Sequence, residues 1–136
     1  MVAKNRYIGG GKSRFVVYSG LTLLDQFAVS SQVPNIIEIV TNKETTRKRI
    51  VVIDGVKFIV RKSRFEITKD NYAYYTTLQL FSELSSSSLE AFAKQRVKEY
   101  LNDNNIDSKT LIRYAMYFPA RVMKNLMGSG VLEEAL

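Results

Sequence analysis

The dipeptide Asp54-Gly55 constrains the fold more than any other short stretch of this chain. It separates two runs of mostly β-branched residues, Ile50–Ile53 and Val56–Val60. Asp-Gly between such runs is a strong signal for a two-residue hairpin turn, because both turn positions need positive φ. The pattern predicts an antiparallel hairpin in which alternate residues from 56 to 60 share one face, whereas Lys57 and Arg61 lie on the other.

Further strand signals stand on both sides of this hairpin. Two short strands are predicted at Arg6–Ile8 and Arg14–Tyr18, joined by a glycine-rich turn, and a buried strand is predicted at Ile36–Val40. A short helix is expected from 19 to 27, with Ser19 available as its cap, because leucines recur there at helical spacing. Residues 65–67 are expected either to form a further short strand or to act only as a connection that returns the chain from the hairpin.

The chain changes character near Asp70, where apolar residues begin to recur at helical spacing. We expect one helix at 72–84, a second after a capping box formed by Ser87 and Glu90, a third capped by Asp107, and a fourth from Pro119 to a glycine stop. The inward-facing positions expected on the last three helices are Leu89, Phe92, Ala93, Val97, Tyr100, Leu101, Leu111, Ile112, Ala115, Met116, Val122, Met123, Leu126 and Met127.

Strands first and helices afterwards predict an α+β fold with a mostly antiparallel sheet in the N-terminal half, packed against about four C-terminal helices. With 136 residues the chain is expected to form one domain, 1–136, with strands and one short helix in 1–69 and helices in 70–136. The helices should cover one sheet face and leave the other, with Lys57 and Arg61, toward solvent or a partner.

The composition excludes several kinds of chemistry. The chain has no cysteine and no histidine. Thiolate and histidine metal sites, Ser-His-Asp triads and Cys-His pairs are therefore closed to it. We expect no enzyme activity, no cofactor and no metal. No apolar run is long enough for a membrane span and no signal peptide is evident, so a cytoplasmic protein is expected.

Two motifs come close to enzyme signatures and miss them. Gly11-Lys12-Ser13 ends like a phosphate-binding loop, but Arg6 stands where the first glycine belongs and a strand-like run follows instead of a helix. A metal-dependent nuclease would need an acid followed by Glu-x-Lys. Asp54 and Glu66 offer this only with Lys69 one residue too far away, so a nuclease remains a distant alternative.

Positive charge gathers in the N-terminal half of the chain. The net charge is +7, and residues 43–64 hold eight basic residues against two acidic ones. Pairing around the Asp54-Gly55 turn should bring Lys48 opposite Arg61 and so unite two basic segments. The residues expected to contact a nucleic acid or an acidic partner are Lys43, Arg47, Lys48, Arg49, Arg61, Lys62 and Arg64. The alternative is that these charges discourage aggregation at a sheet edge.

Aromatic and sulfur side chains are open to two interpretations. The tyrosines at 72, 74 and 75 could stack on bases, but amphipathic positions at the core edge suit tyrosine better. Met116, Met123 and Met127 are interpreted as core filler or as a compliant partner face.

The stretch Tyr18–Phe27, followed by Gln32–Val40, resembles the body of AbiEi-type antitoxins, which are transcriptional regulators of type IV toxin–antitoxin systems. The basic loop, the hairpin ending in basic residues and the Tyr117-Phe118-Pro119 junction follow in the order that this family shows. The resemblance covers roughly residues 15–136.

The resemblance implies a non-enzymatic antitoxin or regulator that opposes a cognate nucleotidyltransferase-like toxin in phage defence by abortive infection. Members of this family usually begin with a winged helix-turn-helix domain, for which the sequence given has no room before Tyr18. DNA binding through the basic N-terminal half, as a basic nucleic-acid-binding protein, is the alternative function.

Overall fold

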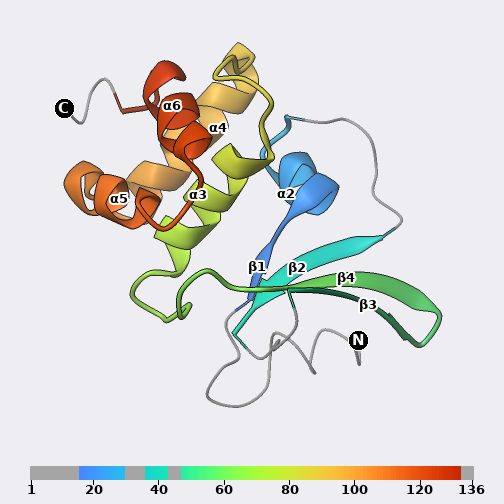
Figure 1. Ribbon diagram of the computed structural model, residues 1–136. Helices are drawn as coiled ribbons and strands as arrows, with labels where there is room; N and C mark the ends of the chain where they lie inside the picture. Colours follow the sequence, from blue (N-terminus) through green and yellow to red (C-terminus); the bar gives the residue numbers. More distant parts are fainter. Residues whose placement is uncertain (1–15, 30–35, 43–46, 133–136) are drawn as a thin grey trace.

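The computed structural model describes residues 16–29, 36–42 and 47–132. Its elements are β1 (Val16–Tyr18), α2 (Gly20–Gln26), β2 (Ile37–Thr41), β3 (Lys48–Ile53), β4 (Val56–Lys62), α3 (Tyr72–Glu83), α4 (Ala91–Asp103), α5 (Ser108–Ala115) and α6 (Ala120–Gly128). Strands thus dominate the first half and helices the second, which confirms the predicted α+β class (Figure 1).

The four strands form one sheet in the order β1-β2-β4-β3. The pair β3·β4 is antiparallel, as expected. The pair β1·β2, which was not predicted, is also antiparallel, but β2 and β4 are parallel. Burial explains this order. Phe58 and Val60 of β4 are 4% and 0% exposed, whereas the first three residues of β3 are exposed, so the strand with the buried apolar side chains takes the central place and β3 the edge.

The hairpin between β3 and β4 forms around the predicted turn. Asp54 and Gly55 have φ values of 51° and 78°. The register pairs Ile53 with Val56 and Lys48 with Arg61, so the expected meeting of residues 48 and 61 is confirmed. The strand expected at Ile36–Val40 is β2. Of the first expected hairpin, Arg6–Ile8 lies outside the described residues, and residues 65–67 form no strand.

The assignment of Lys57 and Arg61 to the face away from the helices was wrong. Val17 and Val40 belong to the core that the helices share, and Arg61 lies beside Val40 in the parallel register. Neighbours in register point to the same face, so Arg61 lies on the helix side of the sheet. Lys57 lies on the same face, because it precedes Arg61 by four residues in β4 and side chains alternate along a strand. The opposite face carries a second apolar cluster that includes Ile39, Phe58 and Val60.

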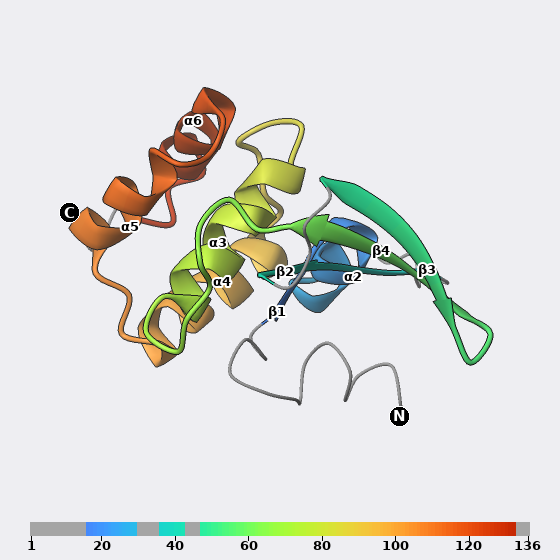
Figure 2. The same ribbon diagram turned by 60° about the horizontal axis from the view of Figure 1, so that its bottom comes forward.

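The main core joins the sheet to all of the described helices. It contains Val17 and Val40 from the sheet, Leu23 from α2, and side chains from α3 to α6 such as Phe81 and Leu111. In Figure 2 the helices α5 and α6 lie on the side of α3 away from the β3–β4 hairpin. A shared core is what a one-domain chain requires, and cooperative unfolding of 1–136 stays a prediction.

Two of the predicted caps differ from the structure. Asp107 caps α5 through its side chain, which accepts a hydrogen bond from the Thr110 N–H, as expected. The capping box at Ser87 was wrong, because α4 begins at Ala91 with Glu90 as its N-cap and without a side-chain cap bond. Ser19 stands at the N-cap of α2, but its buried hydroxyl has no hydrogen-bond partner.

Three residues expected in the core are exposed instead. Phe92, Met116 and Met127 are 68%, 78% and 45% exposed. Phe92 and Met127 each lie one residue away from a buried position, which turns them about 100° around the helix axis. Met116 follows the last residue of α5, so it leaves the buried stripe.

Candidate nucleic-acid interface

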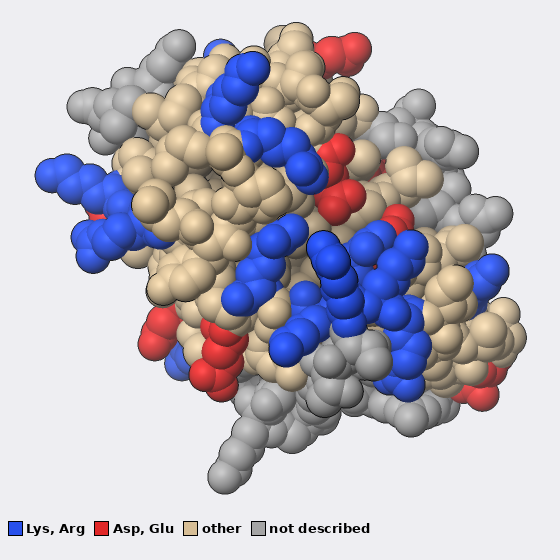
Figure 3. Space-filling view, in the orientation of Figure 1, with Lys and Arg blue, Asp and Glu red and all other residues tan. Residues whose placement is uncertain are grey.

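Six basic residues from two separate segments meet at one end of the β3–β4 hairpin. They are Arg47, Lys48, Arg49, Arg61, Lys62 and Arg64, and they are called the basic cluster below. The Lys48–Arg61 pairing and the Lys62 N–H, which donates to the Arg47 carbonyl at 3.3 Å, bring the two segments together. Lys43, the seventh predicted contact residue, lies outside the described residues. Figure 3 shows Lys and Arg side chains concentrated on this face, below the helices.

The basic cluster borders a surface hollow of about 600 Å³ where the sheet meets α3. Its lining residues are Val40, Arg47, Arg61, Lys62, Ser63, Arg64, Tyr75 and Gln79. Four of these side chains are cationic and none is acidic, so the hollow suits an anionic group.

Arg64 is held from both its backbone and its side chain. Its N–H donates a hydrogen bond of 2.9 Å to the hydroxyl of Tyr75, a residue that is 1% exposed. Its guanidinium carbon lies 5.1 Å from the centre of the Phe118 ring, within cation–π range. Burial raises the pKa of the Tyr75 hydroxyl above its ordinary value, so this group stays a neutral partner near neutral pH.

Asn42 fixes the turn that carries Arg64. Its side-chain amide donates to the Ile67 carbonyl and its Oδ1 accepts from the Ile67 N–H, both at 2.8 Å. The same oxygen accepts from the Ser63 hydroxyl at 2.8 Å. The Asn42 side chain therefore satisfies the backbone N–H and C=O of Ile67, which have no partner strand because residues 65–67 form none. This role of Asn42 could not be predicted, because a single asparagine after a strand gives no signal for a partner 25 residues away.

Arg61 has an acidic neighbour within the fold. Its guanidinium lies 3.8 Å from the Glu38 carboxylate. Glu38 also accepts a hydrogen bond from the Leu21 N–H at 3.2 Å, at the start of α2. Arg61 is therefore partly committed to the fold, whereas Arg47, Lys48 and Lys62 are exposed members of the basic cluster.

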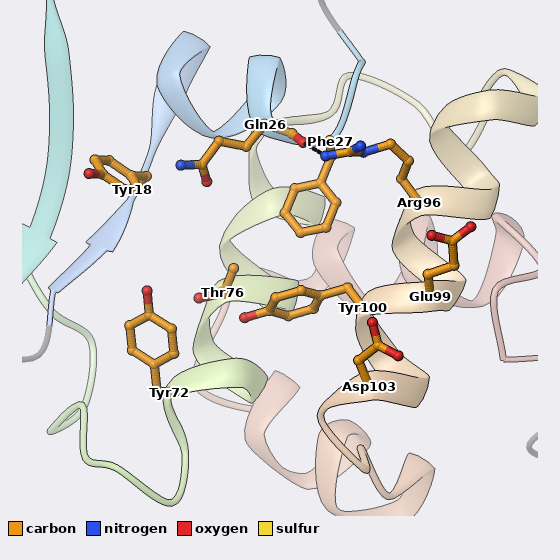
Figure 4. A pocket seen from close by; sticks show the side chains of 9 residues that line it. All are labelled: Tyr18, Gln26, Phe27, Tyr72, Thr76, Arg96, Glu99, Tyr100 and Asp103. Atoms are coloured by element: carbon orange, nitrogen blue, oxygen red, sulfur yellow. Dashed lines mark hydrogen bonds between the residues drawn. The ribbon is translucent and has the colours of Figure 1, made fainter.

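A second hollow, of about 530 Å³, lies between β1, α2, α3 and α4 (Figure 4). Its lining residues are Tyr18, Gln26, Phe27, Tyr72, Thr76, Arg96, Glu99, Tyr100 and Asp103. Arg96 donates to the Gln26 carbonyl at 2.7 Å, and the Phe27 and Tyr100 rings meet edge to face at 5.2 Å. Burial raises the pKa of both Tyr72 and Tyr100. With one arginine and two carboxylates at its rim, this hollow lacks the single sign of charge that marks the basic cluster.

The three clustered tyrosines mostly support the fold. Tyr75 is buried, and the Tyr74 ring packs at 5.4 Å from that of Tyr114 while its hydroxyl accepts from the Asp107 N–H at 3.0 Å. Tyr72 is half-buried beside the second hollow. The core-edge interpretation therefore fits these residues better than base stacking.

The acids of the nuclease alternative are not brought together. Asp54 occupies the tip of the hairpin and Glu66 follows the far end of β4, so a strand of seven residues separates them, roughly 20 Å of chain. Within 16–29, 36–42 and 47–132 the structure shows no group of three acidic side chains that could hold a metal ion. No helix in these ranges is long and apolar enough to cross a membrane.

Comparison with known proteins identifies no family for this chain. No family model matches it, and no match is found among curated proteins or among solved structures. The likeness to AbiEi-type antitoxins therefore rests on the sequence features alone.

Proposed function

We propose that this chain is a non-enzymatic binding module that holds a nucleic-acid phosphate backbone on its basic cluster. The observation that carries the proposal is the register of β3 and β4. By placing Lys48 opposite Arg61, it brings Arg47–Arg49 and Arg61–Arg64 to the same end of the hairpin, where Arg47, Arg61, Lys62 and Arg64 line one hollow.

The energetics of the sheet favour an anionic partner for this surface. Like charges directly opposite each other on paired strands destabilise the pair. The Glu38 carboxylate offsets part of that repulsion at Arg61. A row of phosphates would offset the rest, and each neutralised phosphate would release a bound counterion into solution. The alternative, that these charges only discourage aggregation at the sheet edge, requires charged residues on the edge strand β3 alone. Here the basic cluster also extends onto the central strand β4, so this alternative does not account for all of its members.

Fluorescence anisotropy with labelled single-stranded and duplex oligonucleotides, at a series of salt concentrations, tests this proposal. The wild-type affinity should fall steeply with salt. The double variant Arg47→Glu, Lys48→Glu should bind more weakly and reduce the salt slope by about two, because each lost phosphate contact removes about one.

A matched control separates a local contact from the overall charge. Lys109 and Lys124 are exposed on α5 and α6, outside the basic cluster. Reversing both to glutamate changes the net charge by the same amount and should weaken binding much less. Equal losses in the two double variants would rule out the basic cluster as the contact surface.

A second candidate function is that of an antitoxin-like regulator in a type IV toxin–antitoxin system. The residues that resemble the AbiEi-type family support it, and the partner would be a nucleotidyltransferase-like toxin with an acidic contact face. A gene for such an enzyme immediately downstream is the expected observation. Co-expression should then give a complex that the Arg47→Glu, Lys48→Glu variant loses. An isolated gene with no such neighbour would remove the basis for this candidate.

A further inference from the structure

The basic cluster continues into a group of aromatic rings at the turn between α5 and α6. Arg64 belongs to the cluster and contacts the Phe118 ring, and the next residue, Phe65, lies among further rings. The Phe65 ring is stacked on Tyr114 at 5.1 Å and lies 5.2 Å from Tyr117. Positive charge and aromatic surface are therefore adjacent, with Arg64 between them.

Tyr117 is the exposed member of this ring group. Its side chain is 60% exposed, whereas Phe118 is 7% exposed. The backbone of the turn is fixed, because the N–H groups of Tyr117 and Phe118 donate to the carbonyls of Tyr114 and Ala115 at 3.1 and 3.0 Å. A rigid turn thus presents a large ring to solvent, supported from behind by Phe65.

We propose that the basic cluster and Tyr117 form one site for single-stranded nucleic acid, in which the cluster holds phosphates and an unpaired base stacks on the Tyr117 ring. This inference rests on the proposed function and narrows its ligand. Grooves that combine cations with exposed rings are how proteins bind single strands without reading their sequence. In a duplex the base faces are already stacked on one another, so the Tyr117 ring adds nothing to duplex binding.

The test compares Tyr117→Ala with the wild-type protein on three labelled ligands: a single strand of about a dozen nucleotides, the same strand with abasic residues, and the duplex. Loss of one stacked base should lower single-strand affinity about five- to a hundredfold. Affinity for the duplex and for the abasic strand should stay within about twofold, because their contacts are to phosphates. Tyr117→Phe keeps the ring and should keep the affinity.

Phe92 provides a matched control on another part of the surface. It is an exposed ring on α4, 68% exposed, and Phe92→Ala should leave binding unchanged. Tyr117 and Phe92 are both largely exposed, so both alanine variants should fold. A thermal melt of each variant checks this.

The outcomes distinguish this inference from the proposed function. If Arg47→Glu, Lys48→Glu weakens binding while Tyr117→Ala does not, the stacking inference is wrong and the phosphate contact stands. If the wild-type protein binds the duplex or the abasic strand as tightly as the intact single strand, the inference is also wrong. If it binds no oligonucleotide in a salt-dependent way, the proposed function itself fails.

Discussion

The carboxylate of Glu38 occupies the space that a side chain on Gly20 would fill. A Cβ atom built on Gly20 would collide with this carboxylate, and Gly20 has φ of +57°, a conformation that glycine adopts most easily. The same carboxylate accepts the Leu21 N–H at the start of α2. One glycine and one glutamate thereby join α2 to β2.

Replacing Gly20 by alanine should destabilise the fold through two separate effects. The positive φ costs about 1–2 kcal/mol for any residue with a Cβ atom. The flexible Glu38 carboxylate must also swing aside, which removes its hydrogen bond from the Leu21 N–H. Gly55→Ala is the matched control, because Gly55 also has positive φ, +78°, but its Cβ would meet nothing within 4 Å. Urea denaturation should give the larger loss for Gly20→Ala, and equal losses would contradict the collision with Glu38.

Ser19→Ala should leave the free energy of unfolding unchanged or raise it slightly. A serine that caps a helix with its hydroxyl contributes about 1 kcal/mol, but the Ser19 hydroxyl is buried without a partner. Glu38→Ala should destabilise the chain, since Glu38 supplies the side-chain acceptor at this helix start. A loss near 1 kcal/mol for Ser19→Ala in chemical denaturation would show that the hydroxyl does cap α2.

Glu83→Gln should make stability less dependent on pH. Burial raises the pKa of the Glu83 carboxyl above its ordinary 4.5, and nearby Glu38 raises it further, whereas the Gln79 amide at 2.9 Å, Arg61 and the Gly20 N–H lower it. The folded chain therefore holds this proton more tightly than the unfolded chain. The free energy of unfolding falls as pH rises from about 4.5 through the folded-state pKa.

Urea denaturation at a series of pH values across this window measures the effect of Glu83→Gln. The variant should gain stability relative to the wild type as pH rises, because its amide cannot ionise. A constant difference between the two proteins at every pH would show that ionisation of Glu83 costs the fold nothing.

Leu111→Ala should destabilise the whole chain by about 2–5 kcal/mol, the usual cost of removing a large core side chain. Leu111 is 0% exposed in the core that also holds Val17 and Val40 of the sheet. Phe92→Ala, by contrast, should cost less than about 0.5 kcal/mol, because Phe92 is exposed. Calorimetry should show one transition for each protein. Two transitions, with only one shifted by Leu111→Ala, would contradict a single cooperative unit.

Local patterns were enough to predict the hairpin and the meeting of its basic ends. The Asp54-Gly55 turn fixes the register, and the register then decides that Lys48 lies opposite Arg61. The parallel pairing of β2 with β4 could not be predicted in this way. It depends on which strand buries more apolar surface in the finished sheet, and Phe58 and Val60 decide that by packing against distant residues.

The supporting residues of the site escaped prediction for a related reason. Asn42 holds Ile67 across 25 residues, and the Arg64 N–H donates to Tyr75 on a helix. Neither contact leaves a periodic trace in the sequence. Tyr117 and Phe118 are neighbours in the chain, yet one is exposed and the other buried, and only the turn after α5 determines which.

The place of β4 between β2 and β3 sets the order in which the sheet can be completed. On the ribosome β2 emerges before β4, and its 37–41 edge has no strand to pair with on that side until residues 58–62 have left the exit tunnel. The β3–β4 hairpin closes locally and fast, whereas the parallel pairing must wait for it. Until then the apolar residues of β2 remain open to other chains. Because a hairpin closes within microseconds whereas synthesis adds only about 5–20 residues per second, the time for which β2 stays open is set by the synthesis of residues 42–62 and not by the turn at residues 54–55.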